Sequence, residues 1–506
     1  MNLVEYVEQT TIKYLNENLK SVRKEIGQFF TPGCIAGFMG NLVESDNDEL
    51  NILDAGGGTG ILTAAVLQRI SDFINVRKVN IDVYENNSQV YPVLKNNLSY
   101  MSEALKIKNI KINFRIITDN FITSNFLEWA GFVPYEKYDV VISNPPYKKI
   151  GKNYEEANTM SNIVYGQPNL YFLFMAMGAR LLKQSGELIY IVPKSFSSGL
   201  YFSAFRKWFL ETVKITNLHI FISRDQIFKA DEVLQETIIL RAKKTDVNID
   251  TITITENSDG DMHSVSSFDV PYNTCVSDND DCFLYLPSNQ DDITVLDFIN
   301  QWEHTLCDIG FKMKTGVVVD FRETIWLRTQ KDDSTIPLLW SYNLKNHRMT
   351  FPVNDKNKPQ YLLACPSTAK LQMRVDNYVI LKRFTSKEES KRLQCALLMK
   401  EDFESYACIS TENHLNFITK VSGNMTQEEM FGIFVILNSG YMDKYFRILN
   451  GSTQVNATEI NAMPFPSYDD VVELGAMAMK YNNLDEKICD NLLEYKYGKI
   501  SMAIAI

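Results

Sequence analysis

The sequence has little of what marks a membrane-spanning, secreted or metal-binding protein. It contains no apolar run long enough to span a bilayer, so we expect no transmembrane helix. The first residues, Met-Asn-Leu-Val-Glu-Tyr, lack the basic and then apolar segments of a signal peptide. The eight cysteines form no Cys-x-x-Cys pair, and the spacing of the closest two, Cys275 and Cys282, fits no common zinc site. These absences predict a cytoplasmic protein with free thiols and no metal ion.

The chain also lacks a positive net charge, which argues at first sight against a nucleic-acid partner. Its 506 residues include 51 Lys and Arg against 62 Asp and Glu, a formal net charge of −11. The charges are segregated, however. Residues 246–308 contain 14 acidic and no basic residues, whereas residues 311–400 contain 17 basic and 8 acidic residues. Because a DNA backbone meets a local surface, the second segment is a candidate DNA contact; the alternative is that both blocks are solvated surface.

Short apolar segments alternate with helical patterns from about residue 50 to residue 242. The predicted strands cover 51–54, 79–84, 114–117, 140–142, 188–192, 215–221 and 236–241. The predicted helices cover 61–70, 90–100, 170–182 and 202–211. Such alternation is typical of a parallel, doubly wound α/β sheet, which binds ligands at the carboxyl ends of its strands.

Three regions follow along the chain. Residues 1–245 form the α/β domain. Residues 246–310 are acidic and rich in turns, and they are either a connector or part of the second domain. Residues 311–506 mix short strands and helices without alternation, which predicts a mixed α+β domain.

The most informative motif is Asn144-Pro145-Pro146-Tyr147, directly after the predicted strand 140–142. The prolines remove backbone donors and fix φ, and a residue before a proline is held extended. The amide of Asn144 and the carbonyl of Pro145 are therefore presented together just past the strand end, with the ring of Tyr147 beside them. Two acceptors and an aromatic ring suit a planar group that carries an NH2, such as adenine.

A glycine loop and two carboxylates stand at neighbouring strand ends. Asp54-Ala-Gly-Gly-Gly-Thr-Gly60 joins a strand to a helix, and its glycines allow a sharp turn and close approach of a ligand. No Lys-Ser/Thr follows, so it is not a phosphate-binding Walker loop. Glu85 and Asp119 end the next two strands, where carboxylates accept hydrogen bonds from the ribose or adenine of a nucleoside cofactor. Alone, each feature is equally well explained as a tight turn or a helix cap; together they predict one shared site.

In this order, these motifs resemble the S-adenosylmethionine-dependent amino-methyltransferases. More closely, the chain resembles the γ-class DNA adenine-N6 methyltransferases of restriction-modification systems, the TaqI-like group. Gln28-Phe-Phe-Thr-Pro32 and residues 169–174 and 181–193 resemble further motifs of that family. The glycine loop, residues 54–60, differs from the usual Asp-Pro-Ala-Cys-Gly-Ser-Gly of that family but keeps its acidic and glycine positions. The resemblance covers about residues 1–242 closely and residues 310–465 in general character.

The resemblance implies a Rossmann-like S-adenosylmethionine-dependent methyltransferase domain and a C-terminal mixed α+β target recognition domain. The activity implied is methylation of N6 of a flipped-out adenine in double-stranded DNA, with S-adenosylmethionine as cofactor, as part of a type II system. The implied cofactor-binding residues are Thr31, Asp54, Gly56, Gly58, Gly60, Glu85, Asp119 and Asn144. The implied catalytic residues are Asn144, Pro145, Pro146, Tyr147 and Phe228, with Tyr147 and Phe228 on opposite faces of the base.

The basic segment then has candidate DNA contacts. They are Arg374, Lys382, Arg383, Lys387, Lys391 and Arg392, with Asn413, His414 and Gln454 as polar readers of bases. For His414, a purely structural hydrogen-bonding role is the stronger alternative. The expected partners are double-stranded DNA and a separately encoded cognate restriction endonuclease. The enzyme is expected to act as a monomer in the bacterial cytoplasm, without a membrane contact.

Three other functions are alternatives, and two of them use related chemistry. A protein methyltransferase that modifies a glutamine amide also uses Asn-Pro-Pro-Tyr, and an RNA amino-methyltransferase is a second alternative. A non-catalytic DNA-binding subunit is the third, although the intact motif and carboxylates argue against it. The sequence contains no Pro-Cys dipeptide, which argues against cytosine-C5 methylation through a thiolate.

Overall fold

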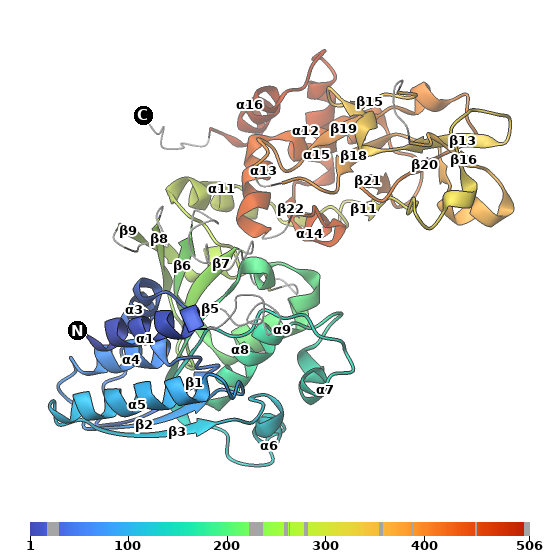
Figure 1. The fold of residues 1–506 in the computed structure, drawn as a ribbon. Coiled ribbons are helices and arrows are strands. Elements are labelled where there is room, and N and C mark those ends of the chain that lie inside the picture. The colour runs from blue at the N-terminus through green and yellow to red at the C-terminus, as the bar shows by residue number, and fades with distance from the viewer. Residues whose placement is uncertain are drawn as a thin grey trace. The chain divides into compact units, whose positions relative to one another are not determined.

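The computed structural model describes residues 1–17, 30–221, 236–257, 262, 264–277, 282–353, 358–386, 388–450 and 453–499 (Figure 1). These residues form two compact units, Met1–Ser288 and Asn289–Ile506. The division lies inside the acidic region 246–310. Among the described helices, none combines the length and the apolar character that crossing a bilayer requires.

The first unit is built on a nine-stranded sheet of order β3-β2-β1-β4-β5-β7-β6-β8-β9. Its strands are β1 (Glu49–Ala55), β2 (Lys78–Tyr84), β3 (Lys111–Ile117), β4 (Tyr138–Ser143), β5 (Leu182–Pro193), β6 (Lys214–Phe221), β7 (Thr237–Lys243), β8 (Thr251–Asn257) and β9 (Val265–Pro271). The strands β3, β2, β1, β4 and β5 are mutually parallel. Each strand that the sequence predicts is present, with ends that differ from the prediction by up to six residues.

The prediction of a wholly parallel sheet is wrong at β7. This strand lies between β5 and β6 and runs antiparallel to both. β7 follows β6 along the chain and returns beside it, whereas a parallel neighbour would need a crossover connection. Apolar composition alone carries no information on strand direction, so the sequence pattern could not reveal this.

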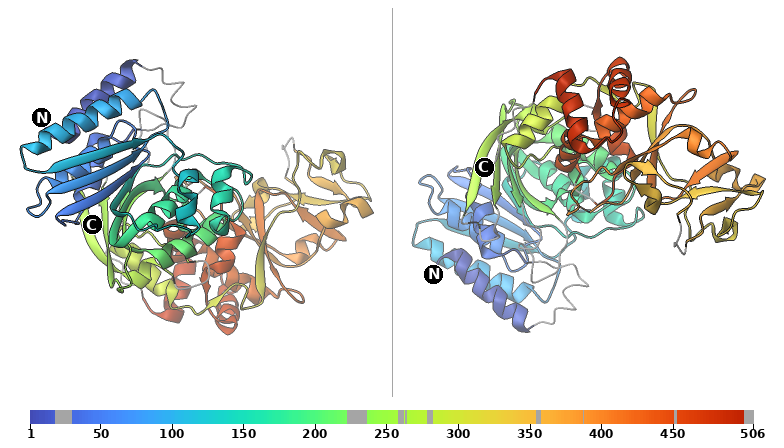
Figure 2. Two further views of the ribbon diagram at one scale, coloured as in Figure 1. Left: turned by 90° about the horizontal axis from the view of Figure 1, so that it is seen from below. Right: turned by 90° about the horizontal axis from the view of Figure 1, so that it is seen from above.

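Helices cover both faces of the sheet (Figure 2). They are α1 (Leu3–Glu17), α3 (Gly33–Asn41), α4 (Ile61–Ile70), α5 (Tyr91–Lys106), α6 (Phe126–Trp129), α7 (Glu155–Thr159), α8 (Leu170–Leu181), α9 (Ser203–Thr212) and α10 (Tyr272–Cys275). Val140 and Ile142 of β4 are buried in one core with α1, α3, α4 and α5. Val141 faces the other side, where its Cγ1 approaches Gly178 of α8. This buried alternation fixes the register of β4, so the chain leaves the sheet at Asn144.

The acidic residues after β7 contribute strands to this sheet. β8 pairs in parallel with β6, and β9 pairs antiparallel with β8. In β8, Thr251, Thr253 and Thr255 alternate with the buried Ile252 and Ile254. β8 and β9 thus form an edge of the sheet of the first unit.

The described residues of the second unit form three smaller sheets, of order β11-β21-β18-β19-β15-β14, β12-β16-β13-β20-β17 and β10-β22. Its strands are β10 (His304–Thr305), β11 (Phe311–Thr315), β12 (Leu327–Arg328), β13 (Thr335–Leu339), β14 (Leu344–Lys345), β15 (Arg348–Met349), β16 (Tyr361–Leu363), β17 (Met373–Arg374), β18 (Tyr378–Lys382), β19 (Cys395–Leu398), β20 (Cys408–Thr411), β21 (Leu415–Lys420) and β22 (Pro464–Phe465). Its helices are α11 (Gln290–Asn300), α12 (Gln427–Asn438), α13 (Gly440–Leu449), α14 (Ala457–Ala462), α15 (Tyr468–Ala478) and α16 (Glu486–Tyr497). This is the mixed α+β architecture that the sequence predicts.

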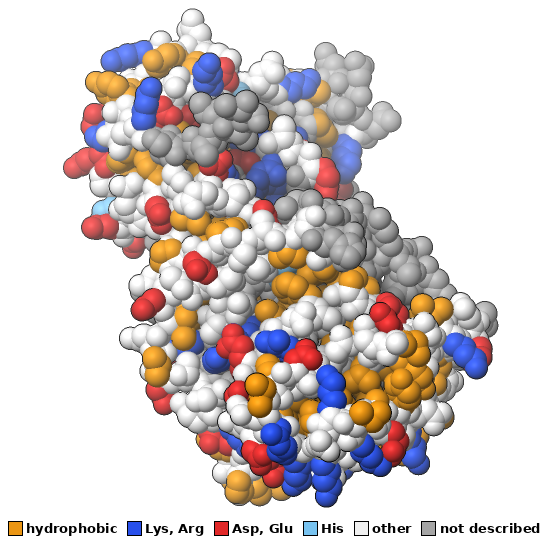
Figure 3. All heavy atoms as spheres, turned by 90° about the vertical axis from the view of Figure 1, so that its left-hand side faces the viewer, with side chains coloured by type: hydrophobic (Ala, Val, Ile, Leu, Met, Phe, Trp, Pro, Cys, Tyr) orange, Lys and Arg blue, Asp and Glu red, His pale blue; other side chains and the backbone are white. Residues whose placement is uncertain are grey.

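On the face shown in Figure 3, basic and acidic side chains of the described residues are interspersed.

Two glycines let α12 and α15 approach closely. A Cβ on Gly475 would lie 1.7 Å from the Glu428 carbonyl oxygen, and one on Gly432 would lie 1.9 Å from that of Val471. We expect Gly475→Ala to force the helices apart and lower the free energy of unfolding by about 1–3 kcal/mol. Gly37→Ala is the matched control, because nothing lies within 4 Å of its added Cβ. Urea unfolding compares the two; equal stability of both variants would contradict the close helix contact.

Candidate active site

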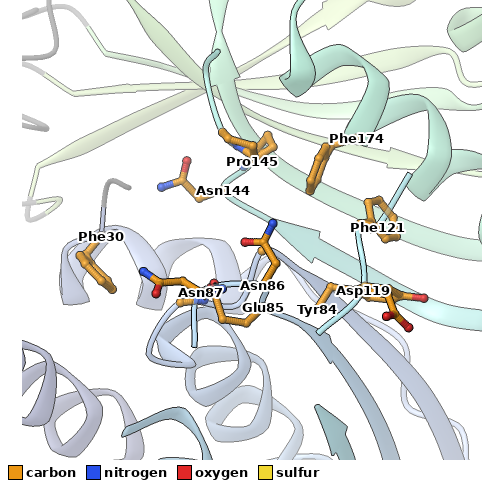
Figure 4. Close-up of a pocket in the computed structure, with 13 residues that line it drawn as sticks. Phe30, Tyr84, Glu85, Asn86, Asn87, Asp119, Phe121, Asn144, Pro145 and Phe174 are labelled. Atoms are coloured by element: carbon orange, nitrogen blue, oxygen red, sulfur yellow. Dashed lines mark hydrogen bonds between the residues drawn. The ribbon is translucent and has the colours of Figure 1, made fainter. Parts of the chain in front are cut away.

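The first unit holds a cavity of about 150 Å³ at the carboxyl ends of β1 to β4 (Figure 4). Its lining residues are Phe30, Gly56, Gly58, Tyr84, Glu85, Asn86, Asn87, Asp119, Phe121, Asn144, Pro145, Pro146 and Phe174. Four strand ends that the sequence marks separately thus meet at one cavity. An open α/β sheet places its ligand sites at this edge.

The glycine loop is shaped by the neighbouring strand. The backbone N–H groups of Gly56 and Gly57 donate to the Tyr84 carbonyl at 3.0 and 2.9 Å. A Cβ on Gly57 would lie 2.2 Å from Val83 Cγ1, so a side chain does not fit there. Gly56 and Gly58 have φ of 89° and 54°, in the left-handed region that favours glycine. The loop backbone itself therefore forms one wall of the cavity.

Glu85 stabilises this loop from the end of β2. Its Oε2 accepts from the Gly58 N–H and its Oε1 accepts from the Asn87 N–H, both at 2.8 Å. Burial raises the pKa of this carboxyl, and the two backbone donors oppose that shift. Each carboxylate oxygen keeps a further lone pair for a ligand hydroxyl. Glu85 can thus hold the loop and bind a diol at once.

Asn144 is oriented by Thr31. The amide Nδ2 donates to Thr31 Oγ1 at 3.1 Å, and Thr31 is almost fully buried at 5% exposure. With the nitrogen turned to Thr31, the side-chain oxygen is the amide atom suited to accept from a substrate. Pro145 follows in the cavity wall. The two acceptors predicted from the sequence are thus adjacent at the cavity.

An aromatic wall completes the cavity, and sequence analysis did not identify it. Phe121 packs against Tyr84 and against Phe174, with ring centroids 5.0 Å apart in each pair. Asp119 is exposed at the rim, beside this wall. Aromatic faces with a nearby carboxylate suit a purine that carries an amine. Phe30, Asn86 and Asn87 were also missed; the Thr-Pro motif and the end of β2 were the signals that could have indicated them.

Asp54 and Gly60 lie outside the residues described as lining the cavity. Asp54 is fully buried, and its Oδ2 accepts from Thr63 Oγ1 at 2.7 Å. Gly60, with φ of 90°, is the N-cap of α4. Asp54 thus lies buried beneath the loop and Gly60 ends it, and contact of either residue with a cofactor stays a prediction.

The buried Asp54 predicts a pH-dependent stability. Burial raises the pKa of its carboxyl from 3.8 to about 7, so the folded protein holds this proton more tightly than the unfolded chain. The resulting stabilisation is complete below pH 3.8 and is lost as the pH rises through about 7. We expect Asp54→Asn to be insensitive to this change, so its melting temperature relative to the native protein rises between about pH 5 and pH 8. Thermal unfolding across that range measures it; parallel pH profiles would exclude the buried carboxyl as the cause.

Tyr147 lies beside the cavity but not among its described lining residues. Its hydroxyl donates to the Ile191 carbonyl at 3.0 Å, and its ring packs edge-on against Tyr171 at 6.2 Å between centroids. Burial strongly raises the pKa of this phenol, so it stays neutral. Phe228, the other predicted stacking residue, lies outside the described residues.

Two of the six predicted DNA-contacting residues are used inside the second unit. Arg392 is fully buried, and its Nε donates to Thr385 Oγ1 at 3.1 Å. Lys391 is 15% exposed in its side chain, and its Nζ lies 3.1 Å from Glu486 Oε2. The prediction of DNA contact is wrong for Arg392, because its side chain is buried inside the unit. Contact of Lys391 with DNA stays a prediction.

The other basic residues are at least partly accessible. The side chain of Arg374 is 48% exposed and pairs with the buried Asp376 at 2.7 Å. Lys382 and Arg383 are half-buried. Lys387 lies outside the described residues. Contact of these residues with DNA stays a prediction.

Comparison with known proteins gives matches along almost the whole chain. Residues 64–228 match the family described as Eco57I restriction-modification methylase. The type II methyltransferase M.BsuBI of Bacillus subtilis is 33% identical over 493 residues, which are 95% of this chain and 95% of that protein. The type II methyltransferase M.PstI of Providencia stuartii is 30% identical over 496 residues, which are 97% of this chain and 96% of that protein.

Proposed function

Since the chain belongs to the type II DNA methyltransferases of restriction-modification systems, we propose that it methylates N6 of an adenine in double-stranded DNA, with S-adenosylmethionine as the methyl donor. The carrying observation is the placement of Asn144 and Pro145 in the wall of a cavity that also holds Glu85 and Asp119. The two groups that can accept hydrogen bonds from an amine thus lie in the same cavity as the two carboxylates that can bind a nucleoside.

The residues that line the cavity suit the proposed donor chemically. Glu85 offers carboxylate oxygens to ribose hydroxyls, and Asp119 at the rim suits an exocyclic adenine amine. A Cβ on Gly56 would point toward the Asn144 carbonyl, 3.8 Å away, and would narrow the space between loop and catalytic motif. When bound, S-adenosylmethionine supplies a methyl group on a sulfonium, and the sulfonium sulfur is a good leaving group without the help of a metal ion.

Catalysis by this chain then consists of accepting hydrogen bonds from the two N–H groups of the amine. The methylated nitrogen afterwards loses one of these protons to solvent, and the donor leaves as a neutral thioether. The lone pair of an adenine N6 is delocalised into the ring, which makes the nitrogen a poor nucleophile. Asn144 Oδ1 and the Pro145 carbonyl, accepting both N–H groups, favour a tetrahedral nitrogen and stabilise the positive charge that develops on it. The hydrogen bond from Asn144 Nδ2 to Thr31 Oγ1 supports this orientation of the amide, and direct transfer requires the amine and the donor methyl group to be in line.

The target base must leave the duplex stack to reach this cavity. Flipping costs a few kcal/mol, and base stacking on an aromatic ring returns about 1–3 kcal/mol. We assign this stacking to Tyr147, whose ring is held by the Ile191 carbonyl, and to Phe228. A monomer visiting one strand at a time suffices for this reaction, and a separately encoded endonuclease would be its partner in the cell.

Modification-sensitive sequencing of DNA from cells that express the protein tests this function. We expect N6-methyladenine at one adenine of a defined sequence. Unmodified DNA, or methyl groups on cytosine alone, would contradict the proposal. Incubation of the protein with methyl-labelled S-adenosylmethionine and either RNA or total protein tests RNA methylation and protein-glutamine methylation. In either case the RNA or the protein, and not the DNA, would carry the label.

Thr31 provides a test of the acceptor geometry. We expect Thr31→Val to lower kcat by about 10- to 100-fold, because Asn144 Nδ2 loses the partner that fixes its amide. Binding of S-adenosylmethionine should change much less. Thr31→Ser keeps the hydroxyl and should restore most of the rate. Steady-state kinetics with calorimetry of cofactor binding measures both; full activity of Thr31→Val would remove Thr31 from the mechanism.

A further inference from the structure

Three chain segments of the second unit, far apart in sequence, meet at the end of β18. Residues 383–385, 412–414 and 453–455 are joined by backbone hydrogen bonds from Arg383 N to His414 O at 2.9 Å and from Val455 N to Arg383 O at 2.8 Å. A third runs from Thr385 N to Thr453 O at 3.2 Å. The side chains on these segments therefore stand on a rigid platform.

The platform is anchored from inside the unit. The buried Arg392 donates from Nε to Thr385 Oγ1, and Thr385 Oγ1 donates to the Arg392 carbonyl at 3.0 Å. Asn450 Nδ2 donates to the Gln454 carbonyl at 3.0 Å, and Asn416 Nδ2 donates to the Val455 carbonyl at 2.7 Å. The role of Arg392 is thus to brace the segment that carries Arg383 and Phe384.

An exposed aromatic ring and two nitrogen-rich side chains lie on this platform. Phe384 is 41% exposed, and its ring centroid is 5.0 Å from that of His414. The Arg383 guanidinium carbon lies 5.4 Å from the Phe384 ring centroid, and Arg383 Nη1 donates to the Asn413 carbonyl at 3.2 Å. The guanidinium has further donors for a ligand.

His414 is held in place by a buried carboxylate. It lies in the tight turn between β20 and β21, where Leu415 N donates to the Glu412 carbonyl at 3.0 Å. Glu412 is 1% exposed; its Oε2 accepts from the His414 backbone N–H at 2.9 Å, and its Oε1 lies 2.5 Å from His414 Nδ1. The His414 side chain is nevertheless 49% exposed. With Nδ1 committed to Glu412, Nε2 is the ring atom available to a ligand.

We propose that Phe384, His414 and Arg383 form a base-reading cluster that contacts the base edges of the DNA target. This proposal rests on the proposed function, from which the duplex substrate comes. Phosphate contact alone would explain the arginine but not an exposed phenylalanine held beside an oriented imidazole. A rigid ring stacks on bases or packs on a thymine methyl group, while arginine and imidazole nitrogens hydrogen-bond to base edges. The local excess of basic residues in 311–400 is opposite in sign to the negative charge of the DNA backbone.

Discrimination between target sequences tests the cluster. The recognition site is first determined with the native protein. Each variant is then assayed on duplexes that carry this site or any single-base change of it. We expect His414→Ala and Phe384→Ala to lower kcat/KM on the recognition site by about 10- to 100-fold and to flatten discrimination at one or two base pairs. Cofactor binding should not change, since neither residue lies in the first unit.

Two further variants separate reading from structure. Glu412→Gln should weaken discrimination at the same base pair as His414→Ala, because Glu412 positions that ring. His304→Ala, a change of an exposed histidine in β10 of the same unit, should leave every base preference unchanged. Native site preference in folded His414→Ala and Phe384→Ala would overturn the cluster while leaving the methyltransferase intact. A native protein that methylates no duplex would instead overturn the proposed function.

Discussion

Asn144→Ala is expected to lower the rate of methyl transfer by at least about a hundredfold while cofactor affinity stays within a small factor of the native value. Removing one hydrogen-bonding group that meets developing charge in a transition state costs about 10²- to 10³-fold in rate. Asn144 also holds its Nδ2 toward Thr31 at 3.1 Å, so the change removes the acceptor without a buried charge being left behind. Single-turnover transfer of labelled methyl to duplex DNA gives the rate, and calorimetry gives the affinity.

The matched control for Asn144 is an asparagine away from the cavity. Asn47 is exposed in the loop before β1, and Asn47→Ala should retain native rate and affinity. A parallel loss of rate and cofactor binding in Asn144→Ala would show that Asn144 builds the cofactor site instead of accepting from the substrate amine.

Glu85→Ala is expected to weaken S-adenosylmethionine binding by at least about a hundredfold. A hydrogen bond to a charged group contributes about 1.5–3 kcal/mol, and the carboxylate would accept from both ribose hydroxyls. The same carboxylate accepts from Gly58 and Asn87 N–H at 2.8 Å, so its loss also loosens the loop. Calorimetric titration of the purified protein with the cofactor measures the affinity.

A conservative variant and a control variant complete the test of Glu85. Glu85→Gln keeps one acceptor oxygen and the shape of the side chain, so its affinity should fall between those of the native protein and Glu85→Ala. Glu49→Ala, at the start of β1 and with a half-exposed side chain, should bind as the native protein does. Native affinity of Glu85→Ala would place the cofactor elsewhere than this cavity.

The features that sequence predicted best are those set by local chemistry. The apolar run of β4 and the two prolines after it determine where the strand stops, so the position of Asn144 at the strand end follows from its near neighbours. The glycine loop and Glu85 follow in the same way, because turns and strand ends depend on residues close by in the chain. Parallel strands then bring their ends together without further information.

The features that sequence missed depend on contacts between distant segments. Phe121 and Phe174 have the composition of core residues, and only the tertiary fold decides that one side of them faces a cavity. Arg392 counts as surface charge in a sequence, yet its side chain is fully buried and donates to Thr385 inside the unit. Asp54 stands at the right strand end but faces Thr63 beneath the loop.

The most direct measurement is the identity of the methylated nucleoside. Purified protein is incubated with duplex DNA and methyl-labelled S-adenosylmethionine, and the DNA is digested to nucleosides and separated by mass. Label in N6-methyldeoxyadenosine from the native protein, and none from Asn144→Ala, is the predicted result. Label on cytosine, or equal label on adenine from both proteins, would contradict a catalytic role for Asn144 at an adenine amine.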